Sequence, residues 1–320
     1  MTATDGTLGI HHITAMAGDA QANLDFYTRV LGLRLVKRTV NFDDPATYHL
    51  YFGDHDGTPG TILTFFPWGA KSLHGRIGTG QVSATAFAIP SSSLSFWADR
   101  LKRLDIATRT AQRFDENVLE LRDRDGVAIE LVAAAGTEST PGWSNGDVRP
   151  EHAIRGFHSA SLSLAGYERT ARLLTDILGF TAGGNANNRF RFAVAGTGMG
   201  SRLDLVCEPG RMRGSMGVGV VHHIAFRAAD DAAQLALRER LVDAGHDVTP
   251  VLDRHYFKSI YFREPGGVLF EIATDPPGFA IDESPAELGT HLKLPPWLER
   301  HRSEIEKHAA PLALAPSNNP

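Results

Sequence analysis

The stretch His11-His12-Ile13 recurs as His222-His223-Ile224, and the second copy is followed by Gly266-Gly267-Val268-Leu269-Phe270-Glu271. Both His pairs lie among β-branched and apolar residues, a composition that predicts strands rather than loops. Neighbouring side chains of a strand point to opposite faces, so we expect one histidine of each pair to face a shared cavity. A lone strand histidine is usually structural, but duplication at the same point of a repeated unit favours metal ligation. Two histidines and a carboxylate with open positions are the ligand set of non-haem Fe(II) oxygenases.

The chain is predicted to contain four copies of one β-α-β-β-β module, in residues 9–66, 82–133, 156–207 and 220–274. In the first copy we expect a strand at 9–17, a helix at 19–32 and strands at 34–41, 48–52 and 61–66. Two of the helix ends align without gaps and share Leu-Gly followed by an apolar residue. Glycine there supplies a left-handed helix end, which indicates a repeat rather than chemistry. We therefore expect an α+β fold in which four βαβββ modules form two pseudo-symmetric barrel-like clefts.

The 320 residues are enough for two domains with sizeable cores. A polar, Gly- and Pro-bearing stretch at 141–150 is the expected linker. Residues 1–145 are then an N-terminal half with two modules, and residues 151–290 a C-terminal half with two more. Residues 291–320 form a C-terminal extension that we expect to be partly disordered, with a charged helix ending at His308 and a disordered tail from Ala309.

Charge and cysteine content exclude several classes of function. The net charge of -5 and the absence of a Lys/Arg run argue against nucleic acid or an anionic membrane as a partner. The single cysteine, Cys207, excludes an intramolecular disulfide, and the N-terminus has no signal-peptide pattern. No segment approaches the ~20 apolar residues of a membrane span. We expect a cytoplasmic protein that acts on a small molecule.

The chain resembles the vicinal oxygen chelate superfamily in its four-module layout, the strand at residues 8–16, the helix end at 26–33 and the ending at Glu271. This superfamily includes glyoxalase I, bleomycin-resistance proteins and type I extradiol dioxygenases. Within the superfamily, the chain resembles the hydroquinone ring-cleaving dioxygenase branch. The segments that carry this resemblance are the two His pairs, Val36-Lys37-Arg38-Thr39, Tyr48-His49-Leu50-Tyr51-Phe52, Gly57-Thr58-Pro59-Gly60-Thr61 and Arg155-Gly156-Phe157-His158. The resemblance implies His12, His223 and Glu271 as metal ligands. It also implies that Tyr261 and Arg254 lie near the substrate, and that the groups supporting the ligands are His11, Thr14 and His222.

The pairing of modules decides which residues share a cleft. If copies one and four pair, His12 joins His223 and Glu271, while Glu130 and His158 are left in a vestigial cleft filled by side chains. If copies three and four pair, as in classical extradiol enzymes, His158 replaces His12. We favour His12 because copies one and four share the His-His dipeptide. The remaining histidines that we singled out have no repeated partner and are expected to be structural or superficial: His49, His74, His152 and His255.

The resemblance and the ligand set together predict an Fe(II)-dependent ring-cleaving dioxygenase, with Mn(II) as the alternative metal. It would insert dioxygen beside a hydroxyl of a hydroquinone-type or catechol-type aromatic. The partners are then a small aromatic and dioxygen, with a homo-oligomer left open. One alternative is a glyoxalase-type lyase or isomerase, which usually needs a second carboxylate ligand. The symmetric position in the first module falls near residues 60–63, where no carboxylate exists. The other alternative is a metal-free aromatic-binding protein of the resistance type.

Overall fold

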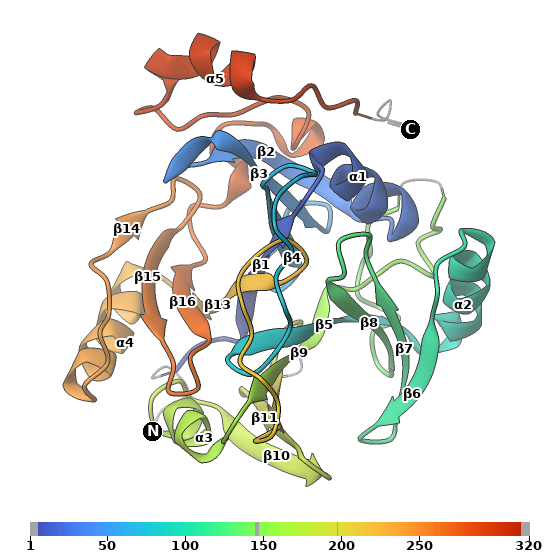
Figure 1. The fold of residues 1–320 in the computed structure, drawn as a ribbon, viewed down its shortest axis with the longest axis vertical. Helices are drawn as coiled ribbons and strands as arrows, with labels where there is room; N and C mark the ends of the chain where they lie inside the picture. The colour runs from blue at the N-terminus through green and yellow to red at the C-terminus, as the bar shows by residue number, and fades with distance from the viewer. Residues whose placement is uncertain (1–5, 145–146, 197, 315–320) are drawn as a thin grey trace.

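Two curled eight-stranded sheets form the body of the protein (Figure 1). The computed structural model describes residues 6–144, 147–196 and 198–314. The first sheet has the order β14-β15-β16-β13-β1-β4-β3-β2, and the second has the order β10-β11-β12-β9-β5-β8-β7-β6. The first sheet therefore joins copies one and four, and the second joins copies two and three. The α+β class with four modules is confirmed, and the alternative pairing of copies three and four is wrong.

Each sheet is built from two modules that meet at their first strands. The strands of the first sheet are β1 (Ile10–Ala17), β2 (Arg34–Asn41), β3 (Asp44–Gly53), β4 (Ile62–Pro67), β13 (Val221–Ala228), β14 (Leu252–Asp253), β15 (Lys258–Arg263) and β16 (Leu269–Thr274). Those of the second are β5 (Gln81–Pro90), β6 (Arg109–Arg113), β7 (Glu116–Arg122), β8 (Ala128–Ala134), β9 (Phe157–Leu164), β10 (Thr181–Ala186), β11 (Arg189–Ala193) and β12 (Arg202–Cys207). The central antiparallel pairs are β1 with β13 and β5 with β9.

Three strands were missed from the sequence, and all three lie at sheet edges: β6, β10 and β14. Their sequences are polar or glycine-rich, for example Thr181–Ala186, whose residues are mostly exposed. An edge strand pairs on one side only and need not bury a hydrophobic face, so it lacks the apolar pattern on which a strand prediction depends.

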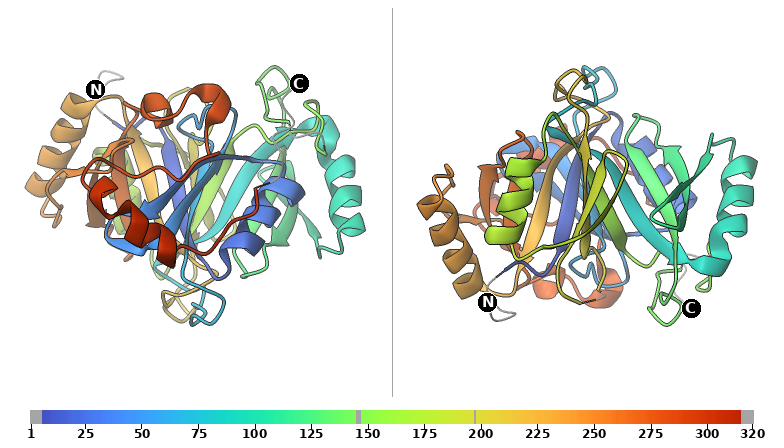
Figure 2. Two further views of the ribbon diagram at one scale, coloured as in Figure 1. Left: turned by 90° about the horizontal axis from the view of Figure 1, so that it is seen from above. Right: turned by 90° about the horizontal axis from the view of Figure 1, so that it is seen from below.

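The helices lie on the outside of the two sheets, with α4 and α2 on opposite sides of the molecule (Figure 2). The expected helix at 19–32 is shorter than predicted and changes geometry partway. It begins after Asp19, whose side chain accepts a hydrogen bond from the Ala22 N–H, and becomes a π-helical turn at Phe26–Val30. The helices are α1 (Ala20–Asp25), α2 (Leu94–Arg103), α3 (Glu168–Asp176), α4 (Asp231–Asp243) and α5 (Arg302–His308).

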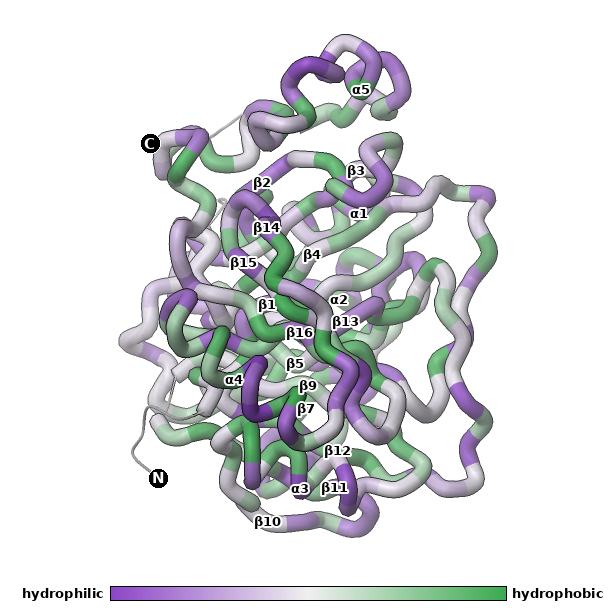
Figure 3. The backbone as a smooth tube through the Cα atoms, turned by 90° about the vertical axis from the view of Figure 1, so that its left-hand side faces the viewer, coloured by the Kyte–Doolittle hydropathy of each residue, from purple (hydrophilic) through white to green (hydrophobic). Residues whose placement is uncertain are grey.

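The core lies between the sheets and these helices, and large side chains such as Trp97, Tyr27 and Phe87 are fully buried. Figure 3 shows hydrophobic stretches along the central strands, whereas the outlying α5 is largely hydrophilic. None of the helices in the described part of the chain is long and apolar enough to cross a membrane.

The C-terminal extension crosses the free edge of β2. The buried Lys37 ammonium group lies 2.6 Å from an Asp282 carboxylate oxygen and 2.5 Å from one of Glu283. Part of the expected disordered tail is bound to the body: the Tyr48 hydroxyl donates to the Ala310 carbonyl at 2.8 Å. Residues 310–314 form neither helix nor strand, and the partial disorder of the extension stays a prediction; residues 315–320 lie outside the described residues, as do 145–146 of the linker.

Candidate active site

Cross-strand register brings the three expected ligands together at the centre of the first sheet. Ala225 of β13 is the partner of both His12 on β1 and Glu271 on β16, so these two residues flank it. The Nε2 atoms of His12 and His223 lie 3.3 Å apart and lie 3.3 and 2.9 Å from the same Glu271 oxygen, Oε2. All three residues are buried, and among the described residues they form the one group of three or more His, Cys, Asp or Glu side chains close enough to share an ion.

The outer histidine of each pair is the extra residue of a β-bulge. Register shifts skip His11 on β1 and His222 on β13, so each bulge places two residues opposite one. A bulge re-aims a side chain, and strict alternation of faces fails at both sites. As a result His11 Nδ1 lies 2.9 Å from His12 Nδ1, and His222 Nδ1 lies 2.8 Å from His223 Nδ1. Both outer histidines thus contact the inner ones directly, rather than pointing away.

These contacts determine the tautomer and the orientation of the inner imidazoles, those of His12 and His223. If the Nδ1 of an inner histidine carries the proton and donates it to the outer ring, its Nε2 keeps a free lone pair toward the centre. Burial lowers the pKa of His223 and lowers the pKa of His222 to about 3, so both rings are neutral near pH 7. Burial also raises the pKa of a carboxyl group, but the neighbouring His12 and His223 hold the pKa of Glu271 well below its usual range. Neutral imidazoles and an ionised carboxylate are the states in which these groups bind a metal.

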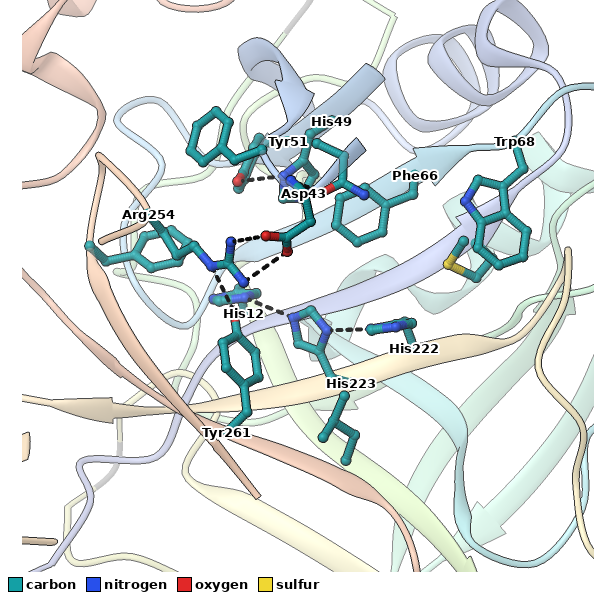
Figure 4. A pocket seen from close by; sticks show the side chains of 15 residues that line it. His12, Asp43, His49, Tyr51, Phe66, Trp68, His222, His223, Arg254 and Tyr261 are labelled. Carbon is teal, nitrogen blue, oxygen red and sulfur yellow. Dashed lines mark hydrogen bonds and ion pairs between the residues drawn. The ribbon is translucent and has the colours of Figure 1, made fainter. Parts of the chain in front are cut away.

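A cavity of about 350 Å³ opens beside the three groups (Figure 4). Its walls are mainly aromatic, with few charged groups, as is typical of a site for a small aromatic molecule. The lining residues are His12, Met16, Asn41, Phe42, Asp43, His49, Tyr51, Phe66, Trp68, His222, His223, Arg254, Phe257, Tyr261 and Leu269.

Tyr261 and Arg254 both reach this cavity. Tyr261 on β15 is the direct partner of Glu271 on β16, and its ring centroid lies 5.8 Å from that of His223. The Nε of Arg254 donates to the Tyr261 hydroxyl at 3.3 Å. Burial raises the pKa of Tyr261 above its usual value, so its hydroxyl keeps its proton at neutral pH.

Thr14 and His11 are not among the residues that line the cavity, whereas His222 is. Thr14 is fully buried and is linked through Thr64 to the histidine at position 49: the Thr64 hydroxyl donates to Thr14 Oγ1 at 2.9 Å, and Thr64 Oγ1 lies 2.8 Å from His49 Nε2. The Tyr51 hydroxyl lies 2.7 Å from the other nitrogen, His49 Nδ1. A continuous row of hydrogen bonds therefore runs from β1 across β4 to β3.

His49 is buried and lines the cavity, so a superficial position is wrong for it, while the structural role stays a prediction. The sequence signal that could have identified it is the alternation His49-Leu50-Tyr51, which places His49 and Tyr51 on one face of β3. Sequence reasoning also missed Ser259, whose hydroxyl donates to Glu271 Oε1, and Asp43 at the mouth of the cavity. Among the other three histidines, His74 is exposed, His152 stacks on Phe96, and His255 lies 3.4 Å from an Asp282 oxygen.

The second sheet repeats the bulged geometry without the ligands. Its central pair of strands skips Ser83 on β5 and His158 on β9, so His158 occupies the position of an outer histidine. By the same register, Ala84 and Ser159 stand where His12 and His223 stand in the first sheet.

The carboxylates that remain in the second cleft are paired with arginines. Glu130 lies 2.6 Å from Arg113, Asp204 lies 2.8 Å from Arg191, and His158 lies 2.8 Å from Glu116. The prediction that this cleft is filled by side chains is wrong, because a cavity of about 1120 Å³ remains there and is lined by Glu130 and its partner Arg113.

The position in the first module that corresponds to Glu271 is Thr64. Glu271 pairs with the residue two places after His223, and Thr64 pairs with Thr14, two places after His12. The sequence estimate of residues 60–63 was one residue short, and its conclusion holds because Thr64 offers no carboxylate.

Comparison with known proteins places the chain in a family. Residues 9–131 and 156–272 match the model of the glyoxalase/bleomycin resistance protein/dioxygenase superfamily. The Bacillus subtilis protein named "Putative ring-cleaving dioxygenase MhqO" is 48% identical over 308 residues, covering 96% of this chain and 97% of that protein. The chlorohydroquinone/hydroquinone 1,2-dioxygenase of Sphingobium indicum is 37% identical over 303 residues, covering 93% of this chain and 94% of that enzyme. A crystal structure of a "putative dioxygenase" from Bacillus subtilis has a TM-score of 0.93 and 47% identity, covering 97% of this chain and 98% of that one.

The chain therefore belongs to the glyoxalase/bleomycin resistance protein/dioxygenase superfamily. Within it, the chain belongs with the ring-cleaving dioxygenases.

Proposed function

We propose that the protein is an Fe(II)-dependent dioxygenase that opens the ring of hydroquinone-type or catechol-type aromatics, with Mn(II) as the alternative metal. The observation that carries the proposal is the convergence of His12 Nε2, His223 Nε2 and Glu271 Oε2 beside an aromatic-lined cavity. The substrate class is supported by the relative from Sphingobium indicum, which is named for chlorohydroquinone and hydroquinone. The homo-oligomeric state, the cytoplasmic location and the boundaries of the two halves stay predictions from the sequence.

The residues present fit a divalent metal. Glu271 Oε2 is fully buried, and the atoms facing it are His12 Nε2 and His223 Nε2, which donate no hydrogen bond when the rings carry their protons on Nδ1. A buried carboxylate oxygen without a donor is costly unless a cation is bound there. Two neutral imidazoles and one carboxylate leave coordination positions open for further ligands. When bound, the metal would supply a centre at which an aromatic hydroxyl and dioxygen meet.

The surrounding residues have separate tasks in this proposal. His11 and His222 hold the inner imidazoles in the orientation that ligation needs, because each contacts Nδ1 of its neighbour. Tyr261, kept protonated by burial, positions a substrate hydroxyl and can donate a proton to the opening ring. Phe66, Trp68 and Phe257 supply apolar surface that orients the ring and excludes water.

Oxygen uptake tests the proposal. The protein is loaded with Fe(II) under argon and mixed with hydroquinone, chlorohydroquinone, methylhydroquinone or catechol in air-saturated buffer. We expect one dioxygen consumed per ring and a ring-opened acid as product, with no turnover under argon. A glyoxalase-type lyase would work equally well without oxygen, and a metal-free binding protein would bind the aromatic without consuming oxygen.

A further inference from the structure

The cavity lies between the ends of the two outermost strands of the first sheet. β14 and β2 are the outermost strands of that sheet, so its curl leaves their edges unpaired with each other. Arg254 directly follows β14, and Asp43 lies in the turn between β2 and β3. Both line the cavity, and Figure 4 shows the Arg254 guanidinium facing the Asp43 carboxylate.

The two residues form a bidentate ion pair across this gap. Arg254 Nη1 donates to Asp43 Oδ1 at 3.1 Å, and Arg254 Nη2 lies 3.0 Å from Asp43 Oδ2. The Arg254 side chain is 18% exposed, whereas that of Asp43 is 71% exposed. The cation thus belongs to the cavity wall, and the anion approaches it from the solvent side. Such a pair contributes only about 0–1 kcal/mol to stability, so stability alone does not account for it.

The Asp43–Arg254 pair determines the charge on the part of the cavity wall that a bound ligand contacts. Arg254 is the one lysine or arginine among the residues that line the cavity. A planar guanidinium is a natural receptor for a carboxylate, because its parallel N–H groups match the two oxygens. Here those two groups are already occupied by Asp43, and the remaining contact, through Nε, goes to the Tyr261 hydroxyl. A carboxylated ring would have to displace Asp43 and also approach its negative charge.

We propose that Asp43 is a specificity-determining residue that keeps Arg254 neutralised and so restricts the cavity to uncharged dihydroxy aromatics. This inference rests on the proposed function and specifies its substrate class. The ring-opened acid, which is an anion, meets the same repulsion, so Asp43 also favours product release over rebinding.

The test compares one added charge with one added methyl group. Methylhydroquinone and 2,5-dihydroxybenzoate share the hydroquinone pattern and differ in having a neutral or an anionic substituent. The measured quantity is the ratio of kcat/KM for 2,5-dihydroxybenzoate to that for methylhydroquinone. The variant is Asp43→Asn, and the control is Asp44→Asn, which removes an exposed charge from the neighbouring position.

We expect the ratio to rise roughly tenfold in Asp43→Asn and to stay at the wild-type value in Asp44→Asn, because like charges held close together are strongly disfavoured. The rise should shrink at 0.5 M salt, since Asp43 is exposed and its charge is screened. If Asp43 served only to join the two edges, both substrates would lose kcat/KM in proportion. A ratio unchanged in Asp43→Asn, or raised equally in Asp44→Asn, would overturn the proposal.

A binding measurement separates this inference from the proposed function. The metal-free wild-type and variant proteins are titrated with the same two compounds by calorimetry. Asp43→Asn should bind 2,5-dihydroxybenzoate more tightly by a similar factor while its affinity for methylhydroquinone changes much less. If no form of the loaded protein consumes oxygen, the proposed function fails, and the calorimetric comparison still decides the role of Asp43. An affinity for 2,5-dihydroxybenzoate that is equal in both proteins, or too weak to detect in both, would contradict it.

Discussion

Nδ1 of His158 lies 3.0 Å from Oγ of Ser159, at a β-bulge in the middle of the second sheet. The same relationship joins His222 to His223 in the first sheet, where a second imidazole takes the place of the serine. The bulge and its outer histidine therefore persist where the ligand is absent. The β-bulge is thus common to both sheets of the duplicated fold. Metal binding depends on which residue occupies the inner position, His223 in the first sheet or Ser159 in the second.

The outer histidines should matter for metal affinity although they are not ligands. His222→Ala removes the group against Nδ1 of His223, so the ligand ring loses its fixed tautomer and orientation. We expect the affinity for Fe(II) or Mn(II) to fall about 10–100-fold. Competition with a chromophoric chelator measures this affinity. His74→Ala, at an exposed site, is the control, and equal affinities in the two variants would contradict the role given to His222.

Tyr261 should affect turnover and not metal binding. Tyr261→Phe removes the hydroxyl that meets Arg254 Nε but keeps the ring beside His223. We expect kcat for ring opening to fall by roughly 10²-fold, the range of a lost proton donor, with unchanged iron content. Stopped-flow absorbance and metal analysis give the two quantities. An unaltered kcat would show that the tyrosine only packs.

Stability of the metal-free protein should depend on pH through His49. Burial lowers the pKa of His49 well below its usual value of about 6.5, so below that pH the unfolded chain binds a proton that the folded chain does not. Stability is then fully present above pH 6.5 and is lost as the pH falls, by up to ~1.4 kcal/mol per pH unit. In His49→Gln the loss between pH 7 and 5.5 should be smaller. Urea unfolding at both pH values tests this, with His74→Gln as the control that keeps the wild-type difference.

Lys37 should be needed to hold the C-terminal extension. Its buried ammonium group is paired with both Asp282 and Glu283, so Lys37→Ala leaves two carboxylates without their cation. We expect a loss of about 3–5 kcal/mol in the free energy of unfolding, the usual cost of breaking a buried ion pair. Chemical denaturation measures it. Lys71→Ala, at an exposed position, should change stability little, and a comparable effect in both variants would argue against the pairing.

Much of the fold could be predicted because the module repeats. The central strands carry apolar runs, and Gly32 and Gly179 end their helical segments at matching points with positive φ. The edge strands β6, β10 and β14 could not be predicted, since they bury no continuous apolar face. The duplicated His-His dipeptide also indicated which modules pair, which decided between His12 and His158.

The fine structure of the site depended on contacts that local sequence does not encode. The bulges at His11 and His222 appear only when β1 and β13 pair, so alternation along a strand does not by itself predict that each outer histidine contacts its inner neighbour. The role of His49 depends on β3, β4 and β1 lying side by side, and the Asp43–Arg254 pair joins residues 211 positions apart. Periodicity predicts which face a residue takes, but not which distant residue it meets there.

The iron content of two variants tests the central claim, that modules one and four build the metal site. Wild type, His12→Ala and His158→Ala are reconstituted with Fe(II) under argon, freed of unbound metal by gel filtration and analysed for iron, with circular dichroism to verify folding. We expect about one iron per chain in wild type and in His158→Ala, and close to none in folded His12→Ala. Iron retained in His12→Ala but lost from His158→Ala would contradict it.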